Sequence, residues 1–395
     1  MRDLSLPRRH FLLASLGGTL SLRPFGILKA APRLPDDPFT LGVASGAPRS
    51  DSVVIWTRLA PKPLEGGGMP ESPIPVDWQV AEDEGFRRIV RKGRVIAEPA
   101  SAHAVHVTVP GLRPARWYWY RFRVGRAVSP VGRTRTAAAP GAAGGLRFAY
   151  ASCQQYEQGF YAAYADMARR DLDLVVHLGD YIYESSWGSR HVRKHMNGIP
   201  TTLPEFRERY ALYKLDPDLQ AAHAAFPWLS IWDDHEVAND YADDHSSAMS
   251  DRDQFLKVRA AAYQAYYEHM PLPPTARPRG PEAVIYDRYA FGRMVNLILL
   301  DDRQYRSPHA CLPGRSASPR VDCPDRLRED RSMLGAAQEA WLDRALADAK
   351  GRWTIVAQQT LMAERDLDPG DGHGYWMDGW DGYAAGRQRL LDGIV

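Results

Sequence analysis

Residues 172–184 read LDLVVHLGDYIYE, in which an apolar run of strand length passes through a glycine into an acidic and aromatic cluster. Gly179 lets the chain turn closely after the strand, so that Asp180 projects from the strand tip. Four other apolar runs end in polar clusters in the same way: residues 146–151, 227–232, 295–300 and 353–357. In an open α/β sheet, ligands bind beyond the carboxyl ends of the strands. We therefore expect the five clusters to form parts of one site.

The segments between these runs include three that are long enough for helices, at residues 159–170, 252–268 and 333–350. Alternation of buried strands with helices predicts a layered α/β domain with helices over a largely buried sheet. We place this domain at residues 146–395, after an Ala/Gly/Pro-rich linker.

Residues 32–140 have a different sequence pattern, which predicts short strands separated by turns and no convincing helix. Leu112 and Pro114, followed by Tyr118 and Tyr120 at a period of two, resemble the tyrosine-corner strand of fibronectin- and immunoglobulin-like domains. We expect a small all-β sandwich here. It contains no cluster of His, Cys and carboxylates, so its expected role is to support or cover a site.

The composition excludes several classes of protein. The 395 residues are 45% hydrophobic and 25% charged, which is typical of a globular chain rather than a disordered one. The formal charge is only +2 and no block of like charge occurs, so we expect no nucleic-acid partner. Three cysteines are too few for a scaffold built on disulfides.

Residues 1–31 carry five basic residues and one acid, a net charge of +4, so the rest of the chain has a net charge of 2 − 4 = −2. Arg8 and Arg9 precede an apolar run at 11–22 that is too short and glycine-rich to span a bilayer. This pattern resembles a twin-arginine export signal. We expect the twin-arginine translocase as a partner during export, a periplasmic or secreted protein, and no stable membrane anchor.

Four clusters carry candidate chemistry, and each has a structural alternative. Cys153 follows a buried strand, where a lone Cys is often a small apolar residue. Asp180 has the position of a carboxylate that bridges cations or of one that caps a helix. Tyr183 is either a phenolate ligand for a ferric ion or an aromatic side chain in a pocket wall. Residues 233–236, DDHE, place three acids and a histidine on one turn, which is more than is needed to cap a helix, so a functional role is favoured. His177, by contrast, lies inside an apolar run, and we expect it in the core.

Together these residues resemble the alkaline phosphatase D family, the PhoD-like branch of the calcineurin-like metallophosphoesterases. The single motifs are short, but their order and combination are specific. They lie at residues 39–46, 53–58, 151–153, 179–184, 232–237, 300–306 and 358–359. The resemblance implies a metallophosphoesterase sandwich of mixed β-sheets flanked by helices, preceded by the N-terminal β-sandwich.

The resemblance also implies a site that pairs a ferric ion, Fe(3+), with calcium, Ca(2+). Cys153 and Tyr183 would be ferric ligands, Asp180 would bridge to the divalent side, and Asn239 would bind there. Thiolate and phenolate suit a trivalent transition metal, and carboxylate and amide oxygens suit a hard divalent ion. Two such cations would neutralise a phosphate ester and lower the pKa of a water, producing a hydroxide nucleophile.

Three further residues are assigned catalytic roles beside the metal ligands. Arg303 would clamp the phosphate through its planar guanidinium. His235 would support the ligands or protonate the leaving group, and Asp234 belongs to the same acidic turn. Asn239 is followed by Asp240 where the family often has a second Asn, which adds a carboxylate and removes no ligand.

One part of the family pattern is not found. The family closes its site with a Gly-Asp-x-His stretch that follows a strand and supplies two ligands. Residues 370–373 fit those letters, but no apolar strand precedes them. Our expectation is that the last strands and the final ligands are missing from a catalytic domain incomplete at its C-terminus.

Cys311 and Cys323 enclose a Pro/Gly/Ser/Arg loop of eleven residues. In an oxidising compartment they can form a disulfide worth about 3 kcal/mol by loop closure. The third cysteine, Cys153, is then left free to bind metal.

The leading hypothesis is an exported metal-dependent phosphoesterase, an alkaline phosphatase or phosphodiesterase whose partner is a phosphate ester. The alternatives are a phospholipase-type phosphodiesterase on the same scaffold and a truncated, non-catalytic periplasmic binding protein. We expect a monomer.

Overall fold

The computed structural model describes residues 36–311 and 323–394. The predicted twin-arginine segment lies outside these residues, as does the loop of residues 312–322 between Cys311 and Cys323. The two cysteines themselves form the predicted disulfide. None of the described helices combines the length and the apolar character needed to cross a bilayer.

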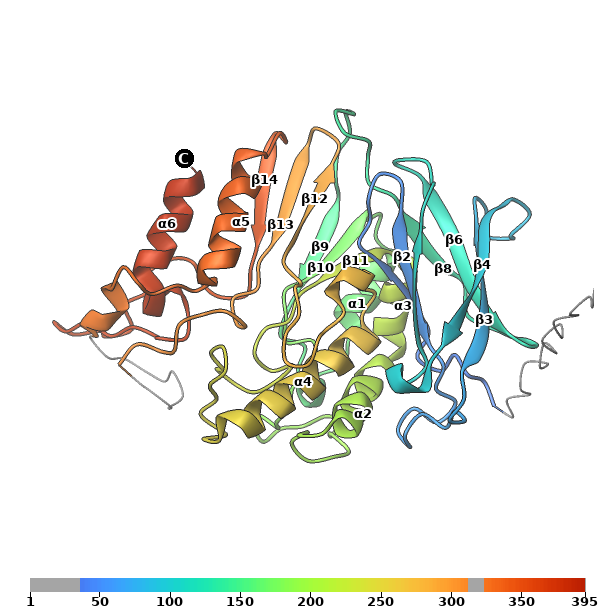
Figure 1. Cartoon of the computed structure of the whole chain (residues 1–395). Coiled ribbons are helices and arrows are strands. Elements are labelled where there is room, and N and C mark those ends of the chain that lie inside the picture. The colour runs from blue at the N-terminus through green and yellow to red at the C-terminus, as the bar shows by residue number, and fades with distance from the viewer. Residues whose placement is uncertain (1–35, 312–322, 395) are drawn as a thin grey trace, which may run out of the picture.

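A six-stranded sheet runs through the middle of the molecule (Figure 1) in the order β5-β2-β1-β11-β10-β9. Its strands are β1 (Val43–Gly46), β2 (Val53–Arg58), β5 (Ala104–Val109), β9 (Phe148–Ala151), β10 (Leu174–His177) and β11 (Pro227–Ser230). Strands β9, β10 and β11 are parallel, and β1 joins them by pairing parallel to β11. The N-terminal strands thus share one sheet with those that end in the predicted site clusters.

The N-terminal sandwich forms because a second sheet covers β5, β2 and β1. This sheet has the order β4-β3-β6-β7, with β8 also paired to β6. Its strands are β3 (Ile74–Ala81), β4 (Ile89–Ala97), β6 (Trp117–Val124), β7 (Ala127–Val128) and β8 (Gly132–Arg135). The Tyr118 hydroxyl accepts a hydrogen bond from the backbone N–H of Arg113 at 2.8 Å, which is the geometry of a tyrosine corner.

A third sheet, β12-β13-β14, lies at the opposite end of the molecule (Figure 1). Its strands are β12 (Asp287–Phe291), β13 (Val295–Leu299) and β14 (Trp353–Ala357). Leu297 and Leu299 share a buried apolar cluster with Val175 and Trp228 of the six-stranded sheet. The two sheets therefore pack on one core, as a sandwich of mixed sheets requires.

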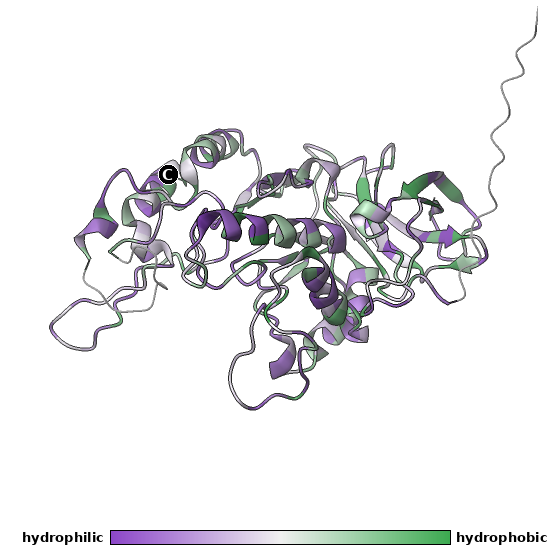
Figure 2. Ribbon diagram, turned by 60° about the horizontal axis from the view of Figure 1, so that its bottom comes forward, coloured by the Kyte–Doolittle hydropathy of each residue, from purple (hydrophilic) through white to green (hydrophobic). Residues whose placement is uncertain are grey.

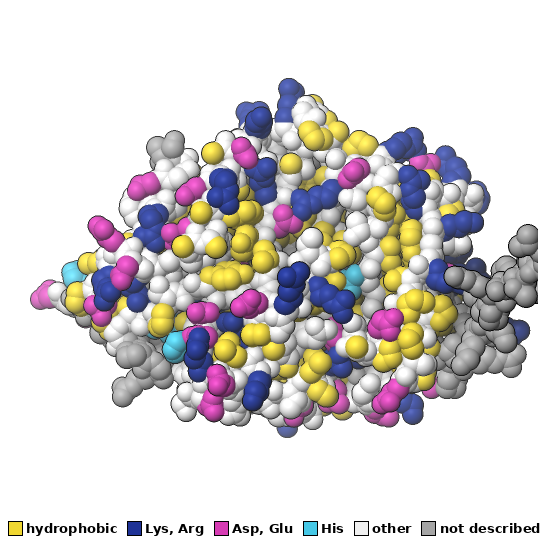
Figure 3. All heavy atoms as spheres, in the orientation of Figure 1, with side chains coloured by type: hydrophobic (Ala, Val, Ile, Leu, Met, Phe, Trp, Pro, Cys, Tyr) yellow, Lys and Arg dark blue, Asp and Glu magenta, His cyan; other side chains and the backbone are white. Residues whose placement is uncertain are grey.

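Within residues 36–311 and 323–394, six α-helices cover the sheets: α1 (Ala162–Arg169), α2 (Leu203–Lys214), α3 (Pro217–Ala225), α4 (Arg252–His269), α5 (Gly335–Ala347) and α6 (Ala384–Ile394). Ile298 of β13 packs with Leu342 of α5 and Leu390 of α6, so these two helices form an outer layer. Hydrophilic and hydrophobic residues alternate along the helices, and hydrophobic residues gather on the strands (Figure 2). On the face drawn in Figure 3, acidic and basic side chains are interspersed, in keeping with the low net charge.

Candidate active site

The loops that follow four strands meet at one pocket of about 720 Å³. Cys153 follows β9, Asp180 and Tyr183 follow β10, and Arg303 follows β13. The loop after β11 contributes the largest share of the lining: Asp233, Asp234, His235, Asn239 and Asp240. All seven sequence-predicted site residues line this one pocket, although they are spread from residue 153 to residue 303.

The loops after β10 and β11 touch through their backbones at Gly179. A side chain there would place its Cβ only 2.4 Å from the backbone nitrogen of Asp233, and the φ angle is +109°. Both conditions require glycine. The next residue, Asp180, adopts a φ of +55°, which is uncommon for a residue with a side chain. The strained turn is what projects the Asp180 carboxylate into the pocket.

Glu236 fixes the two loops relative to each other. Its buried carboxylate accepts hydrogen bonds from the backbone N–H groups of Tyr181 at 2.6 Å, Asp233 at 2.8 Å and Asp180 at 3.2 Å. One side chain from the β11 loop thus holds the backbone on both sides of the contact. This structural role was not foreseen from the sequence, where Glu236 was one of several acids in a row.

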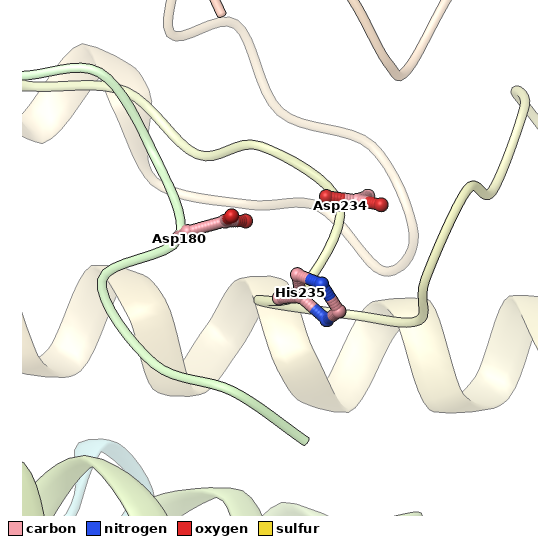
Figure 4. Close-up of side chains that lie close together, drawn as sticks. All are labelled: Asp180, Asp234 and His235. Atoms are coloured by element: carbon pink, nitrogen blue, oxygen red, sulfur yellow. The ribbon is translucent and has the colours of Figure 1, made fainter. Parts of the chain in front are cut away.

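Asp180, Asp234 and His235 form the centre of the pocket (Figure 4). One potential ligand atom from each side chain lies within 4.8 Å of the others, and all three residues are buried. The two carboxylates point toward each other, with the His235 ring beside them. Carboxylate oxygens are ordinary ligands of Ca²⁺, and carboxylates together with an imidazole nitrogen suit Zn²⁺ or iron.

Tyr183 and Cys153 adjoin this centre. The Tyr183 hydroxyl donates to Oδ2 of Asp180 at 2.9 Å, and its ring stacks on His235 with 4.1 Å between centroids. Cys153 is held next to Asp180 because its backbone N–H donates to the carbonyl of Gly179. Like Asp180, Cys153 has a positive φ, +56°. Two strained residues at neighbouring strand tips therefore face the same space.

The titration behaviour of these groups shows that the pocket disfavours negative charge. Burial, and then the neighbouring Asp234, raises the pKa of Asp180 to about 6. Desolvation and the Asp180 carboxylate raise the pKa of the Cys153 thiol to about 12. Burial and Asp180 likewise raise the pKa of the Tyr183 phenol. Without a cation among them, the thiol and the phenol thus stay protonated, and the Asp180 carboxyl ionises less readily than usual.

This arrangement fits a cation. Oδ1 of Asp180 is buried and has no hydrogen-bond partner in the described part of the chain, and leaving such an atom unmatched is costly. A multivalent ion would satisfy that oxygen and stabilise the anionic forms of Cys153 and Tyr183. The thiol and phenol suit iron, and the carboxylates suit either metal, so the donor set accommodates the predicted pair of ions.

His235 is positioned from the loop after β10. Its Nδ1 lies 2.6 Å from Oε2 of Glu184, and Oε1 of Glu184 accepts from the backbone N–H of Asn239. Burial opposes a charge on His235, but Glu184 and then Asp234 raise its pKa to about 10. His235 is therefore held as a proton donor in the absence of a cation.

Arg303 lies among acids. Its Nε–H donates to Asp233 at 2.5 Å and its Nη1 to Asp378 at 2.8 Å, while Nη2 is 3.7 Å from Asp234. Burial disfavours the charge, but these carboxylates raise the pKa of Arg303 well above its ordinary value. The guanidinium is thus permanently charged and rigidly held at the pocket wall.

Sequence reasoning missed Asp378, Glu184 and two pocket-lining indoles, Trp187 and Trp376. Asp378 accepts from Arg303 and Arg306, and only tertiary folding reveals that pairing. Glu184 was quoted within a motif but given no role.

The predicted cluster after β14 and the stretch that fits the Gly-Asp-x-His letters both lie outside the pocket lining. In the cluster after β14, Gln359 binds the backbone N–H of Asp302. In the Gly370–His373 stretch, His373 pairs with Asp366 on an exposed loop.

Comparison with known proteins gives concordant matches. Residues 148–395 match the family model of PhoD-like phosphatase, and residues 26–138 match that of the PhoD-like phosphatase N-terminal domain. The chain is 48% identical over 388 residues to alkaline phosphatase D of Bacillus subtilis (strain 168), covering 96% of this chain and 66% of that protein. It is also similar to a solved structure of PhoD, with 47% identity and a TM-score of 0.89. That match covers 92% of this chain and 70% of the other.

Proposed function

The chain belongs to the PhoD-like phosphatase family, and we propose that it is an exported, metal-dependent phosphoric ester hydrolase, an alkaline phosphatase or phosphodiesterase. The chain spans 66% of the length of its Bacillus relative, so this activity is inferred from the site. The observation that carries the proposal is the buried group of Asp180, Asp234 and His235, with an unmatched carboxylate oxygen beside a thiol and a phenol.

We propose Fe³⁺ and Ca²⁺ as the resident ions. Cys153 and Tyr183 would hold iron, Asp180 would lie between the two ions, and Asn239 would bind calcium. When bound, such ions neutralise the phosphate and lower the pKa of a water molecule. Asp234 and His235 lie close enough to Asp180 to contribute further ligand atoms.

Side chains of the protein itself bind the phosphate and protonate the leaving group. Arg303 is oriented by Asp233 and Asp378 before any substrate arrives, so its remaining N–H groups can donate to a phosphate oxygen without reorganisation. His235 is fixed through Glu184, whose Oε2 lies 2.6 Å from its Nδ1, and this position at the pocket wall suits it to protonate the leaving oxygen. The strained backbones of Cys153 and Asp180 keep the anionic side chains in place.

Export is supported by the Arg8–Arg9 pattern and by the disulfide between Cys311 and Cys323, because such bonds persist in oxidising compartments. We propose a periplasmic or secreted location. Fusion of residues 1–35 to a reporter that is active only after twin-arginine export tests this. A reporter retained inside the cell, or exported equally well by an Arg8→Lys, Arg9→Lys variant, would contradict it.

The experiment for the activity is metal analysis and hydrolysis of 4-nitrophenyl phosphate and bis(4-nitrophenyl) phosphate by the purified protein. We expect bound iron and calcium, turnover that chelation removes, and loss of both in Asp180→Asn. Asp171→Asn is the matched control, because Asp171 is exposed and pairs only with Arg147 in the described structure. A metal-free protein that turns over normally would overturn the proposal. Comparing the monoester, the diester and a phospholipid then identifies the substrate class.

A further inference from the structure

A second, smaller pocket opens beside the catalytic pocket, and we call it the side pocket. It has a volume of about 210 Å³ and is lined by segments 360–367 and 376–381. Trp376 and Asp378 line both pockets, so the two spaces adjoin. Because Asp378 binds Arg303, the side pocket begins one side chain away from the expected phosphate position.

Apart from the exposed side chain of Arg365, the polar groups that line the side pocket are already matched within the protein. The Trp380 indole N–H donates to Gln358 at 3.0 Å, and the Thr360 N–H donates to the same side chain at 2.9 Å. The Asp381 carboxylate accepts from the Arg387 guanidinium and from the backbone N–H of Arg365. These bonds leave few polar groups to recognise a sugar or polyol.

What the side pocket offers is apolar surface. Leu361, Leu367, Trp376 and Trp380 line it, and Leu361 and Trp376 are 57% and 51% exposed. An apolar surface next to a polar pocket favours a ligand with one apolar end. An apolar cavity of ~150 Å³ holds a benzene ring, so the measured volume suffices for one aryl ring or a short acyl chain.

We propose that the side pocket binds an apolar organic group of the substrate, an aryl ring or an acyl chain, while the phosphate lies in the catalytic pocket. This inference rests on the proposed function. It makes the preferred substrate a diester with one apolar arm, in preference to an ester whose second arm is small or a polyol.

The test compares two diesters with the same leaving group, bis(4-nitrophenyl) phosphate and methyl 4-nitrophenyl phosphate. We expect kcat/KM to be about tenfold higher for the aryl diester, since one ring is buried. Leu361→Asn should lower that preference at least threefold. Leu327→Asn is the matched control, because Leu327 is also 57% exposed but lines neither pocket.

Gly379→Leu gives an independent variant that fills the side pocket. A Cβ at Gly379 meets no atom within 4 Å, and its φ of −83° is open to any residue, so the fold should tolerate the change. The preference for the aryl diester should disappear. Equal kcat/KM for the two diesters in the unmodified protein, or an aryl preference unchanged in both variants, would overturn the inference.

If neither diester is cleaved, the phosphodiesterase form of the proposed function fails, and binding decides the inference separately. Calorimetry with phenylphosphonate and methylphosphonate should then show about tenfold tighter binding of the phenyl compound, and no difference in Gly379→Leu. Equal affinities of the two phosphonates for the unmodified protein would refute the side pocket's role.

Discussion

Two groups of ionisable side chains, each with a buried aspartate that lines the pocket, differ in how that aspartate is matched. The first, the open cluster, consists of Cys153, Asp180 and Tyr183, where Asp180 keeps a buried oxygen without a partner. The second, the closed cluster, consists of Arg303, Arg306, His309 and Asp378, where the carboxylate accepts from both guanidinium groups and lies 3.1 Å from the imidazole. The same kind of residue, a buried aspartate, is thus found in opposite states a short distance apart.

The difference separates a buried aspartate whose charge destabilises the folded protein from one whose charge is stabilised by its neighbours. Burial raises the pKa of Asp180 to about 6, which means that its charge destabilises the folded protein. Burial also opposes the charge on Asp378, but Arg303 and Arg306 hold its pKa well below the ordinary value. The closed cluster therefore resembles a structural ion network. The open cluster resembles a site prepared for a ligand.

The comparison is tested most severely by Asp180→Asn. We expect turnover to fall at least ~100-fold, because a pre-organised electrostatic group at the reacting centre is lost. The same variant should stabilise the metal-free protein. Since the folded-state pKa of Asp180 is raised from 3.8 to about 6, its destabilising effect is absent below pH 4 and complete above pH 6. At pH 8 the gain should be about 1–3 kcal/mol.

Thermal unfolding of the metal-free proteins at pH 4 and pH 8 measures this. The stabilisation by Asn should shrink toward zero at pH 4, and metal should stabilise only the unmodified protein. An Asp180→Asn protein that is less stable than the unmodified protein at pH 8 would show that the open cluster is structural.

The open cluster was largely predictable and the closed cluster was not. Each residue of the open cluster follows a strand directly, and residues at the carboxyl ends of parallel strands share an edge. Asp378 follows no strand, and it meets Arg306 only because the chain returns to the pocket 72 residues later. Local patterns contain no information about such a pairing.

The fold shows the same division. The buried runs at β10, β11 and β13 were identified from their composition, whereas the parallel pairing of β1 with β11 across 182 residues was not. Helices α2 and α3 were missed although local signals existed. Thr202 and Glu205 form a capping box, and Asp216 caps the helix that begins at Pro217.

The closed cluster is tested by Asp378→Asn. Loss of the carboxylate leaves Arg303 and Arg306 buried with a missing counter-ion, so we expect a loss of about 3–5 kcal/mol in the free energy of unfolding. Urea denaturation measures it. Asp330→Asn is the control, since Asp330 is 65% exposed at its side chain and pairs with Arg328, and it should change stability by less than ~0.5 kcal/mol. A loss of less than ~0.5 kcal/mol for Asp378→Asn would contradict the assignment of the closed cluster as a structural ion network.

Lys214 extends the comparison to a buried amine that does not line the catalytic pocket and forms no ion pair with a described carboxylate. Its Nζ lies 3.4 Å from Nε2 of His223 and 4.5 Å from the centre of the Trp56 ring, and no described carboxylate forms an ion pair with it. Burial lowers the pKa of Lys214 from 10.5 to about 7. The unfolded chain therefore binds more protons between pH 7 and pH 10.5, and stability rises with pH over that range.

Lys214→Met should consequently stabilise the protein by about 2 kcal/mol below pH 7, after the lost contact with Trp56 is taken into account. The gain should fall as the pH rises from 7 and disappear near pH 10.5. Denaturation at pH 6.5, 8 and 10 measures the trend. Lys257→Met, on the exposed side of α4, should show no such dependence. Destabilisation by Lys214→Met at pH 6.5 would contradict this prediction, because it would mean that the charge of Lys214 stabilises the folded protein.

The smallest expected effect is that of Tyr183→Phe, which separates the two roles of the phenol. In the metal-free protein, removing the hydroxyl deletes the 2.9 Å bond to Asp180, worth about 1 kcal/mol to the ionised carboxylate. The pKa of Asp180 should therefore rise further, which NMR titration of the carboxyl group detects. In the iron-loaded protein, the visible absorption of a phenolate bound to ferric iron should vanish while iron remains bound through Cys153. Retention of that absorption would remove Tyr183 from the ligand set, whereas an unchanged Asp180 pKa would leave the hydroxyl with no part in tuning the open cluster.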